Sequence, residues 1–156
     1  MSRAFTKEDD AGDDLPERPL PPGPNYVTRR GLELLHEEGR ALLARKKDAP
    51  DEERKSIDRD LRYIEARITG AVVVPPGSGK EIRFGARVTY KDDAGQEKII
   101  QIVGDDEARG DRTKLPWSAP LANAMLGAKA GDGVQWKSDS GVNQYTIVAV
   151  DYPADR

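Results

Sequence analysis

Apolar residues recur at helical spacing in two stretches of the chain between residues 26 and 69. Each stretch repeats them at intervals of three and four, which places them along one face of a helix. They are Leu32, Leu35, Gly39 and Leu42 in the first stretch, and Ile57, Leu61, Ile64 and Ile68 in the second. Asp48-Ala49-Pro50 separates the stretches, and proline cannot continue a helix. The pattern predicts an antiparallel two-helix coiled-coil hairpin over residues 26–69.

Both predicted helices have residues suited to their first turns. Thr28 can cap the first helix, and Asp51 is a cap or a first-turn acid of the second, since hydroxyls and carboxylates bind the free amides there. With about 18 residues in each helix, the hairpin would be roughly 27 Å long at 1.5 Å per residue.

After residue 69 the pattern changes to short β-branched runs separated by turn residues. Residues 70–80 combine a short strand, Ala71-Val72-Val73-Val74, with two prolines and a Gly-Ser-Gly linker. Further strands are predicted over residues 83–90, 98–103, 133–137 and 144–151, joined in pairs by turns at 92–95 and 139–141. Gly and Asp in both turns are typical of β-hairpins.

One short helix interrupts these strands. It is predicted over residues 120–126, with Ser118 as its cap and Gly127 as its stop, because Ser and Gly are favoured at these two positions. The whole pattern predicts an α+β fold, in which the hairpin is followed by an antiparallel β-sheet module with one short helix over residues 81–156.

The first 25 residues differ from the rest of the chain. They contain five prolines, few large apolar side chains and an excess of acids. Such a segment buries too little apolar surface to offset the entropy of ordering it. We predict a disordered, acidic, Pro-rich tail over residues 1–25, and a partner-binding arm is the alternative.

The composition of the 156 residues excludes several classes of function. A net charge of −3 provides no strong field for nonspecific capture of nucleic acid. The absence of cysteine and the single histidine, His36, exclude thiolate and clustered-histidine metal sites. No apolar run is long enough for a membrane span or a secretory signal. We therefore expect a cytoplasmic, non-enzymatic protein without a cofactor, a metal or catalytic residues.

Two groups of acids are candidates for chemistry. Asp48, Asp51, Glu52 and Glu53 lie at or near the hairpin tip. They either complement a helix dipole or, on a projecting probe, help to hold Mg²⁺ inside another macromolecule. A second group follows Gly104, and its spacing does not match a calcium loop. It comprises Asp105, Asp106, Glu107 and Asp111, and we expect it to form a solvated loop.

A proline-flanked tryptophan precedes the short helix, in the sequence Pro116-Trp117-Ser118-Ala119-Pro120. A tryptophan in this position either covers the core or anchors an interface, and the sequence leaves both interpretations open.

Taken together, these motifs resemble those of the bacterial Gre family of transcript-cleavage and elongation factors, GreA and GreB. The resemblance covers roughly residues 25–153. It rests on Asn25-Tyr26-Val27-Thr28 with Gly31-Leu32, on Phe84-Gly85-Ala86-Arg87-Val88, on the run from Ile102 to Ala108, and on the run from Pro120 to Gly127 with Gly131-Asp132.

The resemblance implies an FKBP-like C-terminal domain and a partner, bacterial RNA polymerase. In the family this domain grips the rim of the secondary channel, the hairpin enters the channel, and acids at its tip hold a second Mg²⁺ for cleavage of backtracked RNA. The resemblance places the polymerase grip at Trp117, Ser118, Ala119, Pro120 and Leu121. We also expect a monomer, and the near-neutral hairpin and acidic tail favour contact with nucleic acid only through the polymerase.

This chain departs from the family pattern in three ways. It lacks an Asp-x-x-Glu-Asn string at the tip, its hairpin is shorter, and Ala119 replaces the usual serine before proline. The short hairpin is also similar to the branch named nucleoside diphosphate kinase regulators. The leading hypothesis is an elongation regulator at the channel rim with little transcript cleavage. The alternatives are a genuine cleavage-stimulating factor that uses the tip acids, and an interaction module that regulates another enzyme. A prolyl isomerase is suggested by the fold analogy alone.

Overall fold

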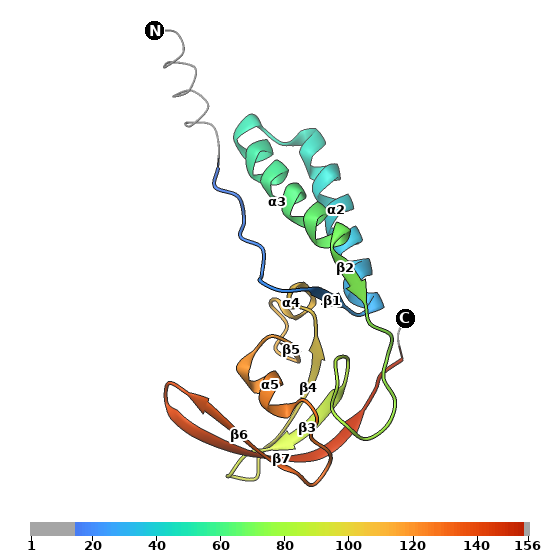
Figure 1. Ribbon diagram of the computed structural model, residues 1–156. Helices are drawn as coiled ribbons and strands as arrows, with labels where there is room; N and C mark the ends of the chain where they lie inside the picture. Colours follow the sequence, from blue (N-terminus) through green and yellow to red (C-terminus); the bar gives the residue numbers. More distant parts are fainter. Residues whose placement is uncertain (1–14, 155–156) are drawn as a thin grey trace. The chain divides into compact units, whose positions relative to one another are not determined.

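The structure, a computed structural model, describes residues 15–154 and forms two compact units (Figure 1). The hairpin unit combines residues 15–23 with residues 35–70, and the sheet unit combines residues 24–34 with residues 71–154. The predicted α+β class is confirmed. Among the described helices, none is long and apolar enough to cross a membrane.

The hairpin consists of α2 (Arg29–Asp48) and α3 (Asp51–Thr69), joined by only two residues. Thr28 caps α2, because its Oγ1 accepts the Gly31 amide at 2.9 Å. Pro50 takes the N-cap position of α3, which leaves Asp51 as a first-turn acid. The apolar stripes meet as predicted, and their buried residues are Leu35, Leu42, Ile57 and Ile64, with Tyr63 beside them. At 20 residues, α2 is roughly 30 Å long.

Tyr63 is buried by a segment that the helical pattern does not include. The guanidinium of Arg18 lies 3.8 Å from the centre of the Tyr63 ring, a favourable cation–π arrangement. Glu17 also accepts hydrogen bonds from Arg62 at 2.6–3.0 Å. Glu17 and Arg18 thus contact α3 from a segment that forms neither a helix nor a strand. Of the predicted disordered tail, residues 1–14 lie outside the described residues.

Five strands form the sheet of the sheet unit in the order β5-β4-β3-β7-β6. Their bounds are β3 Arg87–Lys91, β4 Glu97–Val103, β5 Lys114–Pro116, β6 Gly133–Ser138 and β7 Gly141–Asp151. Three pairs are antiparallel as predicted, but β5 runs parallel to β4. The predicted purely antiparallel sheet differs here because the chain passes through a short helix, α4 (Asp105–Ala108), before it returns to the sheet.

The β-hairpin turns follow the predicted residues. Asp92 Oδ1 accepts the amides of Ala94 and Gln96 at 3.0 and 2.9 Å, and Gly95 adopts a positive φ of 82°. This closes the β3–β4 connection with a side-chain-stabilised turn. Asp139 and Ser140 connect β6 to β7, where Ser138 pairs with Gly141.

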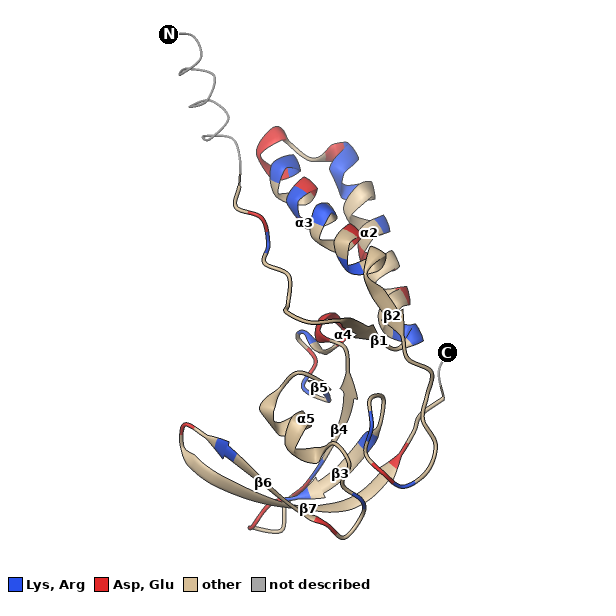
Figure 2. Ribbon diagram, in the orientation of Figure 1, with Lys and Arg blue, Asp and Glu red and all other residues tan. Residues whose placement is uncertain are grey.

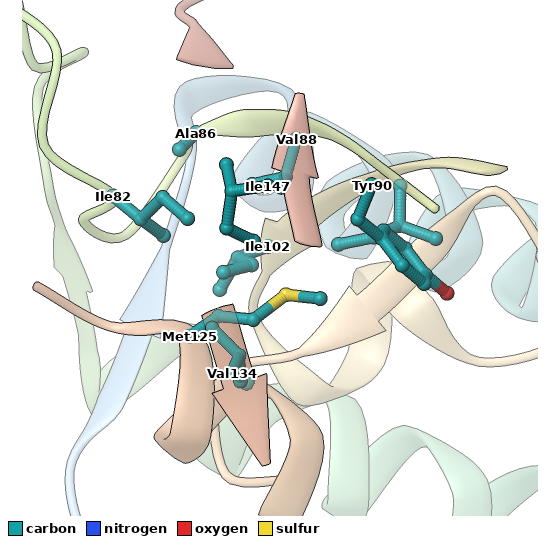
Figure 3. Close-up of a cluster of buried hydrophobic side chains, with 10 residues drawn as sticks. Ile82, Ala86, Val88, Tyr90, Ile102, Met125, Val134 and Ile147 are labelled. Atoms are coloured by element: carbon teal, nitrogen blue, oxygen red, sulfur yellow. The ribbon is translucent and has the colours of Figure 1, made fainter. Parts of the chain in front are cut away.

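The second short helix, α5 (Pro120–Met125), packs in the curl of the sheet (Figure 1). Figure 3 shows apolar side chains from α5 and the sheet directed toward one another around Ile102 and Met125, both fully buried. The buried members of this core are Ile82, Ala86, Val88, Tyr90, Ile100, Ile102, Ala122, Met125, Val134 and Ile147. This core fixes the loop that leads into α5.

A second, two-stranded sheet was not predicted. In it β1 (Asn25–Val27) pairs in parallel with β2 (Ala71–Val73). The strand expected at residues 71–74 therefore exists, and its partner is the segment that immediately precedes Thr28. Asn25, placed at the end of the predicted tail, opens β1. The parallel pair brings both ends of the α2–α3 segment together within the sheet unit.

Candidate functional site

The loop before α5 carries the residues that the family resemblance assigned to polymerase binding. Two backbone hydrogen bonds hold it: the Trp117 amide donates to the Val103 carbonyl at 2.9 Å, and the Ala119 amide donates to the Pro116 carbonyl at 2.9 Å. The loop is therefore fixed against the end of β4.

The side chains of this loop divide into two groups. Trp117, Ala119 and Leu121 pack against the sheet core, whereas Ser118 and Pro120 are exposed. The sequence left open whether Trp117 covers the core or anchors an interface, and in the structure its side chain packs against the core. The residues of this loop that a partner can reach most directly are Ser118 and Pro120.

Ser118 does not cap α5, contrary to the sequence prediction. Its Oγ donates to Asp105 Oδ1 at 2.7 Å, and Ala119 takes the N-cap position without a side-chain hydrogen bond. Pro120 opens the helix, where its missing amide costs nothing. The predicted stop is present, because Gly127 follows the helix with a positive φ of 89°. Ser118 thus ties the loop to α4.

An aromatic hollow adjoins the same loop. Tyr26 meets Trp117 edge-on with ring centres 5.1 Å apart, and meets Phe84 at 6.3 Å. Leu126, itself 38% exposed, lines the same hollow. Trp117 Nε1 is buried and has no hydrogen-bond partner within the described residues. The hollow therefore offers mainly apolar surface beside the exposed Ser118 and Pro120.

At the hairpin tip, here residues 45–54, the Arg54 side chain of α3 binds the end of α2. Arg54 donates to the Lys46 and Lys47 carbonyls at 3.1 and 3.2 Å, which satisfies carbonyls left free at the end of α2. Figure 2 shows basic and acidic positions interleaved over this end of the hairpin. The tip is thus a mixed-charge surface.

The tip acids differ in what they contact. Arg45 pairs with Glu53 at 3.1 Å. Asp48, Asp51 and Glu52 are exposed and have no hydrogen-bond or ion-pair partner within residues 15–154. No three acidic or histidine side chains in the described part of the chain are grouped so that they could hold a metal ion. The tip presents separate carboxylates.

Glu107 is not part of a solvated acidic loop, contrary to the sequence prediction. Its side chain is only 3% exposed and forms an ion pair with Lys114, with Nζ 2.8 Å from Oε2. Its Oε1 also accepts the Thr28 hydroxyl at 2.5 Å. Sequence reasoning missed this role because Thr28 lies 79 positions away. The available signal in the sequence was that Thr28 and Glu107 each belong to a Gre-like motif, the first with Gly31 and the second with Ala108.

The groups with shifted pKa values lie outside the loop before α5 and the hairpin tip. The hydrogen bond and charge of Arg87 lower the pKa of Asp151. Hydrogen bonds from the Thr113 hydroxyl and amide lower the pKa of Asp111. Burial raises the pKa of Tyr90. Each of these three shifts has a local structural cause.

Comparison with known proteins identifies the family. The family profile described as "Transcription elongation factor, GreA/GreB, C-term" matches residues 77–152. GreA of Ralstonia nicotianae is 30% identical over 152 residues, which cover 81% of this chain and 96% of that protein. The chain belongs to the GreA/GreB family of transcription elongation factors. This confirms the family resemblance seen in the sequence.

Other members of the Gre family match over a shorter range. GreB of Neisseria meningitidis serogroup B is 35% identical over 101 residues, which span 63% of this chain and 62% of that relative, less than two thirds of its length. A crystal structure of GreA factor homolog 1 from Thermus thermophilus is 23% identical with a TM-score of 0.42, covering 83% of this chain and 99% of that one.

Two of the Gre-like motifs, one within residues 25–32 and the other within residues 102–108, meet within the sheet unit. A Cβ built on Gly104 would lie 2.5 Å from the Tyr26 carbonyl oxygen, so β1 passes directly against the start of α4. Thr28 and Glu107 extend this contact by their hydrogen bond. Two sequence motifs of this Gre-family chain thus form one structural element.

Proposed function

We propose that this chain binds bacterial RNA polymerase and regulates elongation at the rim of the secondary channel, with little stimulation of transcript cleavage. Its membership of a family of transcription elongation factors supports the choice of partner. The observation that carries the proposal of low cleavage is the tip, where described carboxylates are not grouped as a metal site. In this proposal the protein acts by binding to the polymerase.

The loop from Trp117 to Leu121 is proposed as the polymerase grip. Ser118 and Pro120 are exposed, the loop backbone is fixed by hydrogen bonds, and an apolar hollow lies beside it. A rigid, partly apolar loop loses little entropy on binding. The proposed complex contains one copy of this chain, and nucleic acid is contacted only through the polymerase.

Binding to purified bacterial core RNA polymerase tests the proposal, with a long-hairpin Gre factor as competitor. We expect saturable binding, displacement by the competitor, and weaker binding of Pro120→Ala. Asp93→Asn, in an exposed turn away from the loop, is the matched control and should bind like the wild type. Failure of the wild type to bind at micromolar concentrations would overturn the proposal.

A second candidate is a genuine cleavage-stimulating factor. It is favoured by the exposure of Asp48, Asp51 and Glu52, which have no partner within residues 15–154 and so remain available to complete a metal site inside another macromolecule. RNA cleavage by backtracked polymerase complexes separates the two candidates. Strong cleavage that disappears when these three acids are replaced by alanine would establish the second candidate; cleavage near background would support the first.

A further inference from the structure

A buried carboxylate in the sheet unit joins three segments of the chain. Glu107 belongs to α4, and its side chain is 3% exposed. Thr28, immediately before α2, donates its hydroxyl to Oε1 at 2.5 Å. Lys114 at the start of β5 reaches Oε2 at 2.8 Å. A buried charge with a hydroxyl and an ammonium partner is well satisfied.

The first turn of α2 is shaped around this carboxylate. Thr28 Oγ1 accepts the Gly31 amide at 2.9 Å while it donates to Glu107. A Cβ built on Gly31 would lie 2.9 Å from Glu107 Oε1, closer than such contacts normally allow. The carboxylate also lies near the helix N-terminus, where negative charge is favourable. Alanine at position 31 would require the Glu107 carboxylate to shift.

The preceding residues are held with similar closeness. A Cβ on Gly104 would meet the Tyr26 carbonyl oxygen at 2.5 Å, and the Val74 amide donates to the Val27 carbonyl at 2.9 Å. Residues 25–31 are therefore fixed on one side by α4 and on the other by β2. All of these residues belong to the sheet unit.

We propose that Glu107 is a positioning residue that anchors the root of the hairpin. The anchor consists of Thr28, Gly31, Glu107 and Lys114. The anchor holds the first turn of α2, which belongs to the sheet unit, and α2 continues from this turn without interruption. This inference rests on the proposed function, in which the loop provides affinity for the polymerase and the hairpin provides the effect on elongation.

A matched pair of glycine substitutions in α2 tests the anchor without the polymerase. Gly31→Ala inserts a methyl group against Glu107. Gly39→Ala places the same group 3.5 Å from Ile64 Cγ2, an ordinary contact. We expect hydrogen exchange of the first-turn amides of α2 to accelerate at least about tenfold in Gly31→Ala and to remain unchanged in Gly39→Ala. Equal first-turn exchange rates in the two variants would overturn the anchor.

Glu107→Gln gives a milder test if Gly31→Ala does not fold. Its amide oxygen still accepts the Thr28 hydroxyl, but the charge that holds Lys114 is lost. First-turn exchange should lie between those of the wild type and Glu107→Ala, while the core amides of β3 and β4 stay protected. Equal acceleration throughout the sheet unit would show a general loss of stability and would overturn a positioning role.

The functional test measures affinity for the polymerase separately from the maximal effect on elongation. For Glu107→Gln we expect the half-saturating concentration for polymerase to stay within about twofold of the wild type, while the maximal effect on elongation falls by more than half. An unchanged maximal effect would overturn the anchor's role in function. If wild-type protein does not bind polymerase, the proposed function fails, whereas hydrogen exchange still decides whether the anchor exists.

Discussion

The root and the tip of the hairpin use carboxylates in opposite ways. At the root, Glu107 is almost fully buried and receives a hydroxyl and an ammonium group. At the tip, Asp48, Asp51 and Glu52 are exposed without partners inside residues 15–154. Burial makes the root acid costly to lose and leaves it unavailable to a ligand, whereas the tip acids contribute little to stability and remain free to meet a partner.

Glu107→Ala is expected to have the largest effect on stability. It leaves Lys114 without its partner, and we expect a loss of about 3 kcal/mol, near the lower end for breaking a buried pair, since the Lys114 side chain keeps 21% exposure. Urea denaturation measures the loss. Glu97→Ala, at an exposed strand position, is the control. A loss below about 1 kcal/mol would remove the distinction between root and tip.

Gly104→Ala tests the same root through shape instead of charge. The new methyl group would meet the Tyr26 carbonyl at 2.5 Å, and because the obstacle is backbone, β1 or α4 must shift. We expect a loss of about 1–3 kcal/mol, typical of overpacking, seen as a lower urea midpoint. A midpoint equal to that of the wild type would show that β1 is not held tightly.

Gly39→Ala should change stability in the opposite direction. The position is helical, and the added Cβ makes only an ordinary contact with Ile64. Alanine also restricts the unfolded chain, so we expect a gain of about 0.5–1 kcal/mol. Thermal unfolding followed by circular dichroism measures it. Destabilisation would indicate that α2 and α3 pack too closely at this position to accept the added methyl group.

Neutralising the tip should have little effect on stability. Asp51→Asn combined with Glu52→Gln removes first-turn acids that favour the α3 dipole, and such exposed charges each contribute about 0.3–1 kcal/mol at low salt. We expect a small loss in low salt that shrinks at high salt. A large, salt-independent loss would mean that the tip acids have structural partners and would break the comparison.

Asp151→Asn should give the smallest effect of the series. Asp151 pairs with Arg87 on an exposed face of the sheet, and the pair lowers the pKa of Asp151. Its contribution is therefore present above the unfolded pKa and is lost as pH falls through the folded pKa. Melting curves of variant and wild type should differ slightly at neutral pH and converge in acid. Asp93→Asn, in an exposed turn, is the control.

The sequence was sufficient where structure depends on neighbours along the chain. The apolar stripes predicted α2 and α3, and Asp92 with Gly95 predicted the β3–β4 turn. These features arise from local spacing and turn chemistry. Pro50 located the start of α3, and Gly127 located the end of α5 to within about one residue.

Prediction failed where a residue depends on a distant partner. Glu107 belongs to an acid-rich segment, and one of its two partners, Thr28, lies 79 positions earlier. Tyr63 lies outside the apolar stripe, and its ring is covered by Arg18 from a distant proline-rich segment. The three-residue strand β5 was too short to show a pattern. For the candidate site, the sequence supplied the loop residues, but the structure was needed to separate exposed Ser118 and Pro120 from their partly buried neighbours.

The distance along the chain between Thr28 and Glu107 has a consequence for how the protein forms during synthesis. The contacts within the α2–α3 hairpin are complete once residue 69 has left the ribosome, whereas the carboxylate that holds the first turn of α2 arrives later. Local contacts form quickly, and closing a long loop is slow. A nascent chain should therefore carry a folded hairpin before Glu107 can bind Thr28. The order of synthesis separates hairpin formation from the fixing of the first turn of α2.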